Sequence, residues 1–473
     1  MVTQMMIDAM TAMIKEKLMV FCGDAAEGPL NMAAAEEVCR AIRLTVAEVG
    51  KAGFRTYLEA KEEQKDIVVV DGETYRFKQF TRKSFFAPWG KMEVNRKLFQ
   101  NASDTKSHVP LDAAWNMTDE LMTVEVREAC AFACVHMTPV DAAQLFEKSS
   151  MFQPDPTAIK RVLRRIDAVV SPVREEIDER IRMDEEAPKG VRVLAGSMDG
   201  VNVLLNEPGK KRGRPAERPG GEAAKETPTA YKNAMVGTCS FYADVRKDEH
   251  CPERLATRYV AQMPEEHALT FKAKFEAELE AAEAQCPSNT VKVMLCDGAR
   301  GIWTYIDGNT RYDGYEKLVD YWHTIEHLSL AAEALFGKGS PEGAAWYTKH
   351  AKWLKEKVRG AQGVLDSIDY YARNRKLPAG RQKDLNTQRT YFVRNKHRMT
   401  YADFRERGLP IGSGPVEAGC KSIVKCRLCR SGMRWSRTGG QRILDLRTYV
   451  KSNRWEAFWQ EYKQAAIALS AVA

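Results

Sequence analysis

Apolar residues recur at helical spacing over residues 1–65, together with glutamate and lysine pairs such as Glu59 and Lys61. This pattern predicts a helical N-terminal region over 1–65. It then gives way to two β-rich runs on either side of Asp71-Gly72, a dipeptide typical of hairpin turns. Residues 66–115 are therefore predicted to form a small β-rich module.

Helical patterns return over residues 116–190. Thr138-Pro139 is typical of a helix start, because proline suits the first helical position. Thr157 follows a proline-rich break at 153–156 and is a candidate cap for the next helix. That helix carries four basic residues, namely Lys160, Arg161, Arg164 and Arg165. Either the two helices form a helix-turn-helix that binds DNA, or they are a helical hairpin with a solvated basic face.

Strand-like and helical segments alternate over residues 191–330. Apolar runs at 191–194, 201–205, 235–242 and 291–295 predict strands, and a long helix is expected over 265–284. This succession indicates an α/β domain. Residues 331–408 are helical and basic, and residues 409–473 begin with a loop of glycine and proline before helical patterning resumes.

The chain of 473 residues is too long for one compact core, so we expect several domains. The net charge of +8 indicates an anionic partner. No apolar run is long enough to span a membrane, and the first residues lack the order of a signal peptide. The eleven scattered cysteines suit a reduced, cytoplasmic protein.

Three acidic residues occupy positions where a catalytic role is the best explanation for a carboxylate. Asp199 interrupts one apolar strand pattern and Asp297 ends another, and each is followed by a glycine that leaves room beside the carboxylate. Glu417 falls in the first turn of a helix predicted to start at Ser413 or Gly414. An Asp-Gly pair alone is more often a turn. Together, however, two strand carboxylates and one helix carboxylate suit a phosphoryl-transfer site that holds two Mg²⁺ ions.

Several stretches resemble the DDE transposases of bacterial insertion sequences, and more narrowly the ISKra-type group. They are Ser197–Gly200, Leu295–Ala299, Asp320–His323, Gly408–Glu417 and Ser431–Ser436. The resemblance covers about 190–460 best. It implies an RNase H-like catalytic core, an α/β fold with a mixed sheet flanked by helices, in which Asp199, Asp297 and Glu417 are the metal-binding triad.

The resemblance also implies cofactors and partners. Two Mg²⁺ ions, replaceable by Mn²⁺, would be the cofactors. The terminal inverted repeats of a transposon and the target DNA would be the substrates. At least a homodimer would assemble on the DNA, in the cytoplasm and at the nucleoid.

Cations follow Glu417 closely in the sequence. Lys421 and Lys425 lie at helical spacing from Glu417, so they project from the same helix face and suit a scissile phosphate. Further candidates for DNA binding are Arg427, Arg430, Arg434, Trp435 and His323. Trp435 either stacks on an unpaired base or packs in the core.

Histidines and cysteines near the triad leave alternatives open. His323 either contacts DNA, packs in the core or, with His327, binds zinc. Cys420, Cys426 and Cys429 are interpreted as ordinary thiols, because no fourth ligand accompanies them.

Two segments between the acids complete the prediction. Asp297 and Glu417 are 120 positions apart, which exceeds what such a core needs, so 331–408 is expected to be a helical insertion that clamps DNA. Residues 208–228 are expected to be a flexible loop. This loop contains Lys211, Arg212 and Arg214, which are either an AT-hook for the DNA minor groove or simply a basic loop.

Two other functions remain open from the sequence. A structure-selective nuclease with the same fold would cut DNA without joining it. A DNA-binding protein derived from a transposase would keep the basic surfaces and lose a carboxylate, whereas all three acids are present here.

Overall fold

The computed structural model describes residues 2–25, 31–103, 105–115, 117, 121–149, 152–206, 231–245 and 251–472. The chain divides into two compact units, one formed by Met1–Ile177 with Glu456–Ala473 and the other by Asp178–Trp455. The basic loop with Lys211, Arg212 and Arg214 lies outside the described residues. No helix in the described part of the chain is long and apolar enough to cross a membrane.

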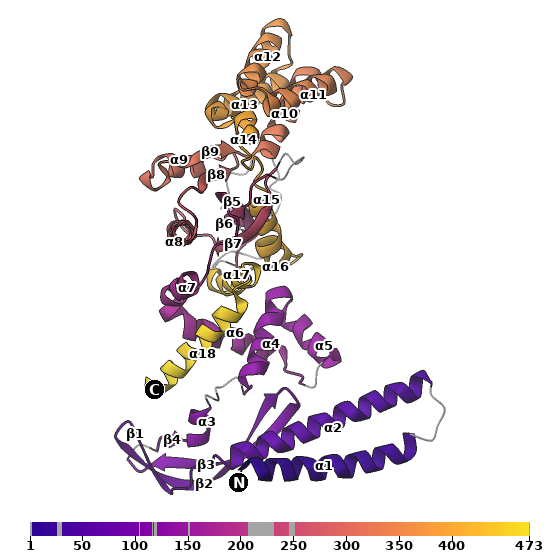
Figure 1. Cartoon of the computed structure of the whole chain (residues 1–473), viewed down its shortest axis with the longest axis vertical. Helices are drawn as coiled ribbons and strands as arrows, with labels where there is room; N and C mark the ends of the chain where they lie inside the picture. Colours follow the sequence, from indigo (N-terminus) through magenta and orange to yellow (C-terminus); the bar gives the residue numbers. More distant parts are fainter. Residues whose placement is uncertain are drawn as a thin grey trace, which may run out of the picture. The chain divides into compact units, whose positions relative to one another are not determined.

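The first unit opens with two long helices, α1 (Val2–Ala25) and α2 (Met32–Glu59), which pack against each other (Figure 1). An antiparallel sheet follows in the order β1 (Ile67–Val70), β2 (Glu73–Ala87), β3 (Gly90–Asn101) and β4 (Ser107–His108). The turn between β1 and β2 is Asp71-Gly72, with φ values of 51° and 79°. Positive φ at both positions is what a tight hairpin turn requires, so the predicted hairpin is confirmed.

One face of this sheet packs on a helix. Phe85, Met92 and Val94 are buried in a cluster with Leu58 of α2 and Leu111. Alternate residues of a strand point to opposite faces of a sheet. The residues between these buried positions therefore project from the other face.

Five more helices complete the first unit: α3 (Pro110–Ala114), α4 (Val124–His136), α5 (Pro139–Ser149), α6 (Pro156–Val170) and α18 (Trp455–Val472). The predicted start at Pro139 is confirmed. Asp155, rather than Thr157, caps α6, because its carboxylate accepts the backbone N–H groups of Thr157 and Ala158. Arg127 of α4 is buried, and its guanidinium lies 3.5 Å from the Tyr462 hydroxyl of α18.

The predicted basic helix is present as α6, which packs against α4 and α5. Lys160, Arg161 and Arg164 are exposed on it, whereas Arg165 is half-buried. The interpretation of α5 and α6 as a helix-turn-helix stays a prediction.

The second unit is built on a mixed five-stranded sheet in the order β7-β6-β5-β8-β9. The strands are β5 (Val193–Leu204), β6 (Tyr231–Tyr242), β7 (Arg254–Gln262), β8 (Val291–Cys296) and β9 (Glu316–Val319). The first three are antiparallel, and β8 and β9 run parallel to β5. The mixed α/β arrangement predicted for this region is confirmed.

Helices cover both faces of this sheet. On one face lies α8 (Leu269–Gln285), which comes so close that a Cβ atom at Gly196 would lie 3.3 Å from Phe275 and 3.2 Å from Leu279. On the other face lie α15 (Gly414–Gly419), a π-helix (Cys420–Lys425) and α17 (Arg437–Lys451). A Cβ atom at Gly419 would lie 3.1 Å from Val236 of β6. Glycine permits this close approach.

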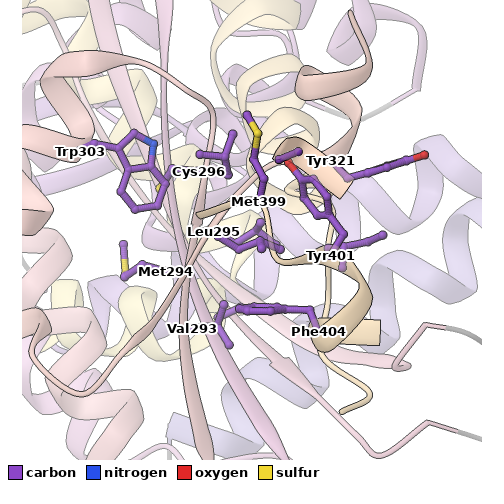
Figure 2. Packing of buried hydrophobic residues seen from close by; sticks show 14 of the residues in the cluster. Val293, Met294, Leu295, Cys296, Trp303, Tyr321, Met399, Tyr401 and Phe404 are labelled. Carbon is purple, nitrogen blue, oxygen red and sulfur yellow. The ribbon is translucent and has the colours of Figure 1, made fainter. Parts of the chain in front are cut away.

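The remaining helices gather beyond β8 and β9. They are α9 (Arg300–Asp307), α10 (Tyr321–Phe336), α11 (Pro341–Glu356), α12 (Gly360–Asn374), α13 (Ala379–Asn395) and α14 (Tyr401–Glu406). Elsewhere, α7 (Arg174–Met183) spans the boundary of the two units, and the short α16 (Cys426–Leu428) follows the π-helix. Figure 2 shows β8 residues packed between Trp303 of α9 on one side and Tyr401 and Phe404 of α14 on the other. This packing fixes the end of β8, after which Asp297 follows.

A buried ion cluster joins three segments of the second unit. Arg454, in the turn after α17, donates to both carboxylate oxygens of Glu278 on α8 at 2.8 and 2.6 Å and to those of Glu185 at 2.7 and 2.6 Å. Burial by itself raises the pKa of Glu278, but the charge and hydrogen bonds of Arg454 outweigh it and hold that pKa below its usual value.

We expect the substitution Arg454→Met to destabilise the second unit by about 3–5 kcal/mol, because it leaves the buried Glu278 carboxylate without its main partner. Urea unfolding followed by tryptophan fluorescence measures this loss. The matched control is Arg373→Met, at an exposed position, which should change the free energy of unfolding by less than about 0.5 kcal/mol. Equal midpoints for both variants would contradict the prediction.

Candidate functional site

Asp199 and Asp297 are brought together by two parallel neighbouring strands. The pairing of β5 with β8 runs from Val193 opposite Val291 to Gly196 opposite Met294. If this register is continued by three residues on each strand, Asp199 comes opposite Asp297. Adjacent strands lie about 4.8 Å apart, so the two side chains meet at the same end of the sheet.

The immediate contacts of these two carboxylates are backbone groups and one thiol. Asp199 accepts the N–H of Gly200 at 2.6 Å and the Cys420 thiol at 3.3 Å. Asp297 accepts the N–H of Ala299 at 3.0 Å. Among the residues that the structure describes, neither carboxylate forms an ion pair with lysine or arginine.

The electrostatics at Asp297 reflect this lack of a cation. Burial raises the pKa of the Asp297 carboxyl, and the charges of Asp199 and Asp320 raise it further. The N–H of Ala299 and the nearby His323 act in the opposite direction, but the net direction is upward. Negative charge is therefore concentrated here, which is the condition that a bound cation relieves.

Glu417 lies on the helix that touches Asp199. It is an exposed residue in the first turn of α15, which has Ser413 as its N-cap residue and proline near its start, as predicted. Cys420 follows on the same helix and contacts Asp199. Burial and the charges of Asp199 and Glu417 raise the pKa of the Cys420 thiol.

The helix changes type directly after Glu417. Residues Cys420–Lys425 form a π-helix, in which Cys420, Ile423 and Val424 are buried and Lys421 and Lys425 are exposed. The Lys421 ammonium lies 4.0 Å from the Glu417 carboxylate. Short π-helices are rare and often mark functional sites.

Glu417 is nevertheless not part of a closed ligand set. Within the described ranges, no group of three or more His, Cys, Asp and Glu side chains is arranged so that it could hold a metal ion. The structure therefore brings Asp199 and Asp297 together as a pair and puts Glu417 on the adjoining helix.

Asp320 connects this helix to the sheet. Its side chain is fully buried at the end of β9, where one carboxylate oxygen accepts the N–H of His323 at 2.7 Å and the other accepts the N–H of Ser413. Its own N–H donates to the Cys296 carbonyl at 2.8 Å. Asp320 thus links the strand end before Asp297 to the loop that leads to Glu417.

Sequence reasoning named Asp320 only as the first residue of the Asp320–His323 element. The signal that could have shown more is an aspartate directly before a helix, which is typical of an N-cap. Nothing local in the sequence indicates that its second oxygen accepts the N–H of Ser413, because the two residues are distant in the chain.

The histidines after Asp320 have protein partners. The ring of His327 stacks on Tyr391 at 3.5 Å, and its Nδ1 lies 2.6 Å from the Gln388 side-chain oxygen. Burial lowers the pKa of His327. This arrangement favours the core-packed interpretation of His327 over zinc binding. His323 is only half-buried and lies near Asp297. Its charge opposes the net rise in the pKa of the Asp297 carboxyl.

The cations after Glu417 fall into two groups. Lys421, Lys425, Arg430 and Arg434 are exposed. Arg427 is buried, and its guanidinium lies 5.1 Å from the centre of the Trp435 ring, a cation–π contact.

Trp435 is tied to the end of β5. Its N–H donates to the Leu204 carbonyl at 3.1 Å, and its indole N–H donates to the Leu428 carbonyl at 3.1 Å. The burial of Arg427 and the two hydrogen bonds of the half-buried Trp435 hold the segment after Glu417 in place. Their DNA contacts stay a prediction.

Cys426 and Cys429 are free thiols, as expected, and each donates to a backbone carbonyl. Their interpretation as ordinary thiols agrees with these contacts.

Comparisons with known proteins give little beyond this geometry. No model of a known protein family matches the chain, and no curated protein matches it. Among solved structures, the chain is similar to a Drosophila P element transposase strand transfer complex, with a TM-score of 0.32 and 12% sequence identity over 71% of this chain and 93% of that chain. A likeness this distant decides neither the fold nor the function.

We expect Asp320→Asn to loosen the loop before Glu417. Asparagine keeps one accepting oxygen, so the N–H of either Ser413 or His323 would face an amide NH₂, a loss of about 1–3 kcal/mol. Hydrogen–deuterium exchange over 411–419 measures the effect, and faster exchange there is expected. The exposed Asp313→Asn is the control. Unchanged exchange in the Asp320 variant would show that this contact does not hold the loop.

Proposed function

We propose that the chain is a DNA transposase that uses Asp199, Asp297 and Glu417 to cut transposon ends and to join them to target DNA. The observation that carries this proposal is the proximity of Asp199 on β5 to Asp297, which directly follows the parallel neighbour β8, without a basic partner in the described part of the chain. Glu417 lies on the helix that contacts Asp199 through Cys420.

The residues fit a divalent cation. Carboxylate oxygens are hard ligands of the kind that Mg²⁺ prefers, and the raised pKa of Asp297 reflects repulsion that a cation would remove. Asp199 and Asp297 would hold the metal, and Glu417 would complete the ligand set when α15 moves closer on DNA binding. When bound, Mg²⁺ or Mn²⁺ ions, two in this proposal, would stabilise charge on the attacking and leaving oxygens.

The fold supports the same proposal. Asp199 lies on the central strand β5 and Asp297 directly follows its neighbour β8, in a mixed sheet with helices on both faces. A mixed sheet flanked by helices is the arrangement that the resemblance to RNase H-like cores predicts. The helices between Asp297 and Glu417, α10 to α14, would be the insertion.

Exposed cations beside Glu417 would hold the DNA backbone. Lys421 and Lys425 project from the π-helix, and Arg430 and Arg434 follow within the next loop. Their charges would bind the phosphates flanking the scissile bond, which positions the strand without reading its sequence.

The proposed reaction has two in-line steps. In the first, a water oxygen attacks the phosphorus at the transposon end and the 3′ oxygen leaves as a hydroxyl, with one proton released. In the second, that 3′ hydroxyl attacks a target phosphodiester, whose own 3′ oxygen leaves. Asp199 and Asp297 would fix the reacting phosphate through the metal they hold, and no covalent protein intermediate is needed.

A structure-selective nuclease would use the same residues for the first step alone, and it is the second candidate. The terminal inverted repeats, a homodimer on DNA and a location at the nucleoid belong to the transposase proposal.

We expect Asp199→Asn, Asp297→Asn and Glu417→Gln each to lower the rate of metal-dependent DNA cleavage by more than about 100-fold, because each removes a proposed metal ligand. Labelled transposon ends with Mg²⁺ or Mn²⁺ report cleavage and joining in one gel. Calorimetric titration with Mn²⁺ reports metal binding separately, and it should weaken in the two aspartate variants.

The controls are Asp313→Asn and Glu406→Gln, at exposed positions in the same unit, and both should cut at the wild-type rate. Full cleavage by any of the three site variants would refute the site. A wild-type protein that cuts and never joins would establish the nuclease instead.

A further inference from the structure

The β2–β3 hairpin of the first unit has an exposed stretch on the face opposite its cluster with α2. Phe85, Met92 and Val94 point into the cluster with α2. On the opposite face, Phe80 and Arg82 of β2 and Asn95 of β3 are exposed, and Arg82 lies directly opposite Asn95 in the ladder. This outer face of β2 and β3 is called the open ribbon face below.

Cations without acidic partners gather on this hairpin. Arg76, Lys78, Arg82 and Lys91 are exposed, and none forms an ion pair among the described residues. Two other basic residues of the hairpin are paired, since Arg96 pairs with Asp112 and Lys97 with Asp66. Arg82 and Lys91 project from the open ribbon face, Lys78 is the bulged residue beside it, and Arg76, opposite Gln100, projects from the other face.

Acids on the hairpin do not neutralise these cations. Glu73 and Glu93 are the acidic residues between positions 73 and 101. Glu73 accepts hydrogen bonds from Tyr75 and Asn101, and Glu93 accepts one from Ser84. The hairpin therefore carries a net positive charge, which attracts a polyanion.

An exposed aromatic ring stands in the middle of this surface. Phe80 is 56% exposed, and its ring meets the edge of Phe77 at a centroid distance of 5.3 Å. The strand has an irregular register between Phe77 and Gln79, where Lys78 is the extra residue. A bulge of this kind bends a strand and increases its twist.

We propose that the open ribbon face binds duplex DNA in the major groove, at a place separate from the carboxylate site. The major groove is about 12 Å wide and admits a two-stranded ribbon. Arginine and asparagine are the side chains that pair with guanine and adenine edges there, which suits Arg82 and Asn95. Lys78 and Lys91 would bind phosphates, and Phe80 would contact a thymine methyl group.

This inference rests on the proposed function only in taking DNA as the substrate. The surface would give the protein a means of recognising duplex sequence that does not depend on the metal site. The competing occupant, an acidic protein, is not favoured, because an arginine and an asparagine facing each other across a ribbon match base edges.

The test is fluorescence anisotropy with a labelled mixed-sequence duplex in EDTA, so that no cleavage occurs. The triple variant Lys78→Gln, Arg82→Gln, Lys91→Gln removes three proposed contacts. We expect the slope of log affinity against log salt to become shallower by about 2.7, which is the release of three counterions. The matched control is Lys15→Gln, Arg40→Gln, Arg43→Gln, which removes the same charge from exposed positions of α1 and α2 and should leave the slope unchanged.

Two further variants guard against misfolding of the triple variant. Arg82→Glu alone should weaken duplex binding at least tenfold with an unchanged circular dichroism spectrum, and Phe80→Ala should weaken binding without changing the salt slope. Equal slopes for the triple variant and wild type would overturn the inference. So would binding of single-stranded DNA as tightly as duplex, or binding of an acidic protein with no binding of duplex.

The failure of this inference and that of the proposed function are distinguishable. If the ribbon variants bind like wild type while Asp199→Asn abolishes cleavage, the ribbon proposal fails and the transposase proposal stands. If the ribbon variants lose binding while Asp199→Asn cuts normally, the ribbon proposal stands and the transposase proposal fails.

Discussion

The parallel pairing of β5 with β8 is the constraint on which the candidate site depends. It sets two carboxylates side by side at the same end of the sheet, where neither has a lysine or arginine partner in the described part of the chain. Burial and repulsion raise the pKa of Asp297, which means that its ionised carboxylate destabilises the fold. Packing in the surrounding core must offset this free-energy penalty. The packing of β8 between Trp303 and Tyr401 does so by fixing the strand end from which Asp297 projects.

The third acid depends on a different interaction. Glu417 is far from the strands in sequence, and its helix is held by the buried carboxylate of Asp320, which accepts the N–H of Ser413. Because Asp320 also donates its own N–H to Cys296, the loop before Glu417 and the strand before Asp297 share one anchor. The π-helix after Glu417 then keeps Cys420 against Asp199 while Lys421 stays exposed.

Much of this could be predicted from the sequence, where local patterns decide the structure. The hairpin at Asp71-Gly72, the strands around Asp199 and before Asp297, and the helix start at Pro415 all follow from turn chemistry, alternation and capping. The features that the sequence did not predict depend on contacts between distant residues. Strand β7 was not expected, since its pattern is irregular and its pairing with β6 crosses a long connection. Arg427 looked like a surface cation, but the fold buries it beside the Trp435 ring. Residues after Glu456 group with the first unit, which the helical pattern alone could not indicate.

The separation of binding from chemistry follows from the charges themselves. Three carboxylates repel a phosphodiester, so a site built from them contributes little affinity for DNA until a cation is present. Affinity must then come from basic residues that stand apart from these acids. Such residues include those after Glu417 in the second unit and those on the β2–β3 hairpin in the first. In the proposed function the cations after Glu417 would hold only the backbone beside the reacting bond, and backbone contacts carry no sequence information. Recognition of a particular DNA end therefore requires a surface that presents side chains to base edges, and among the described residues the ribbon with Arg82 opposite Asn95 has that chemistry.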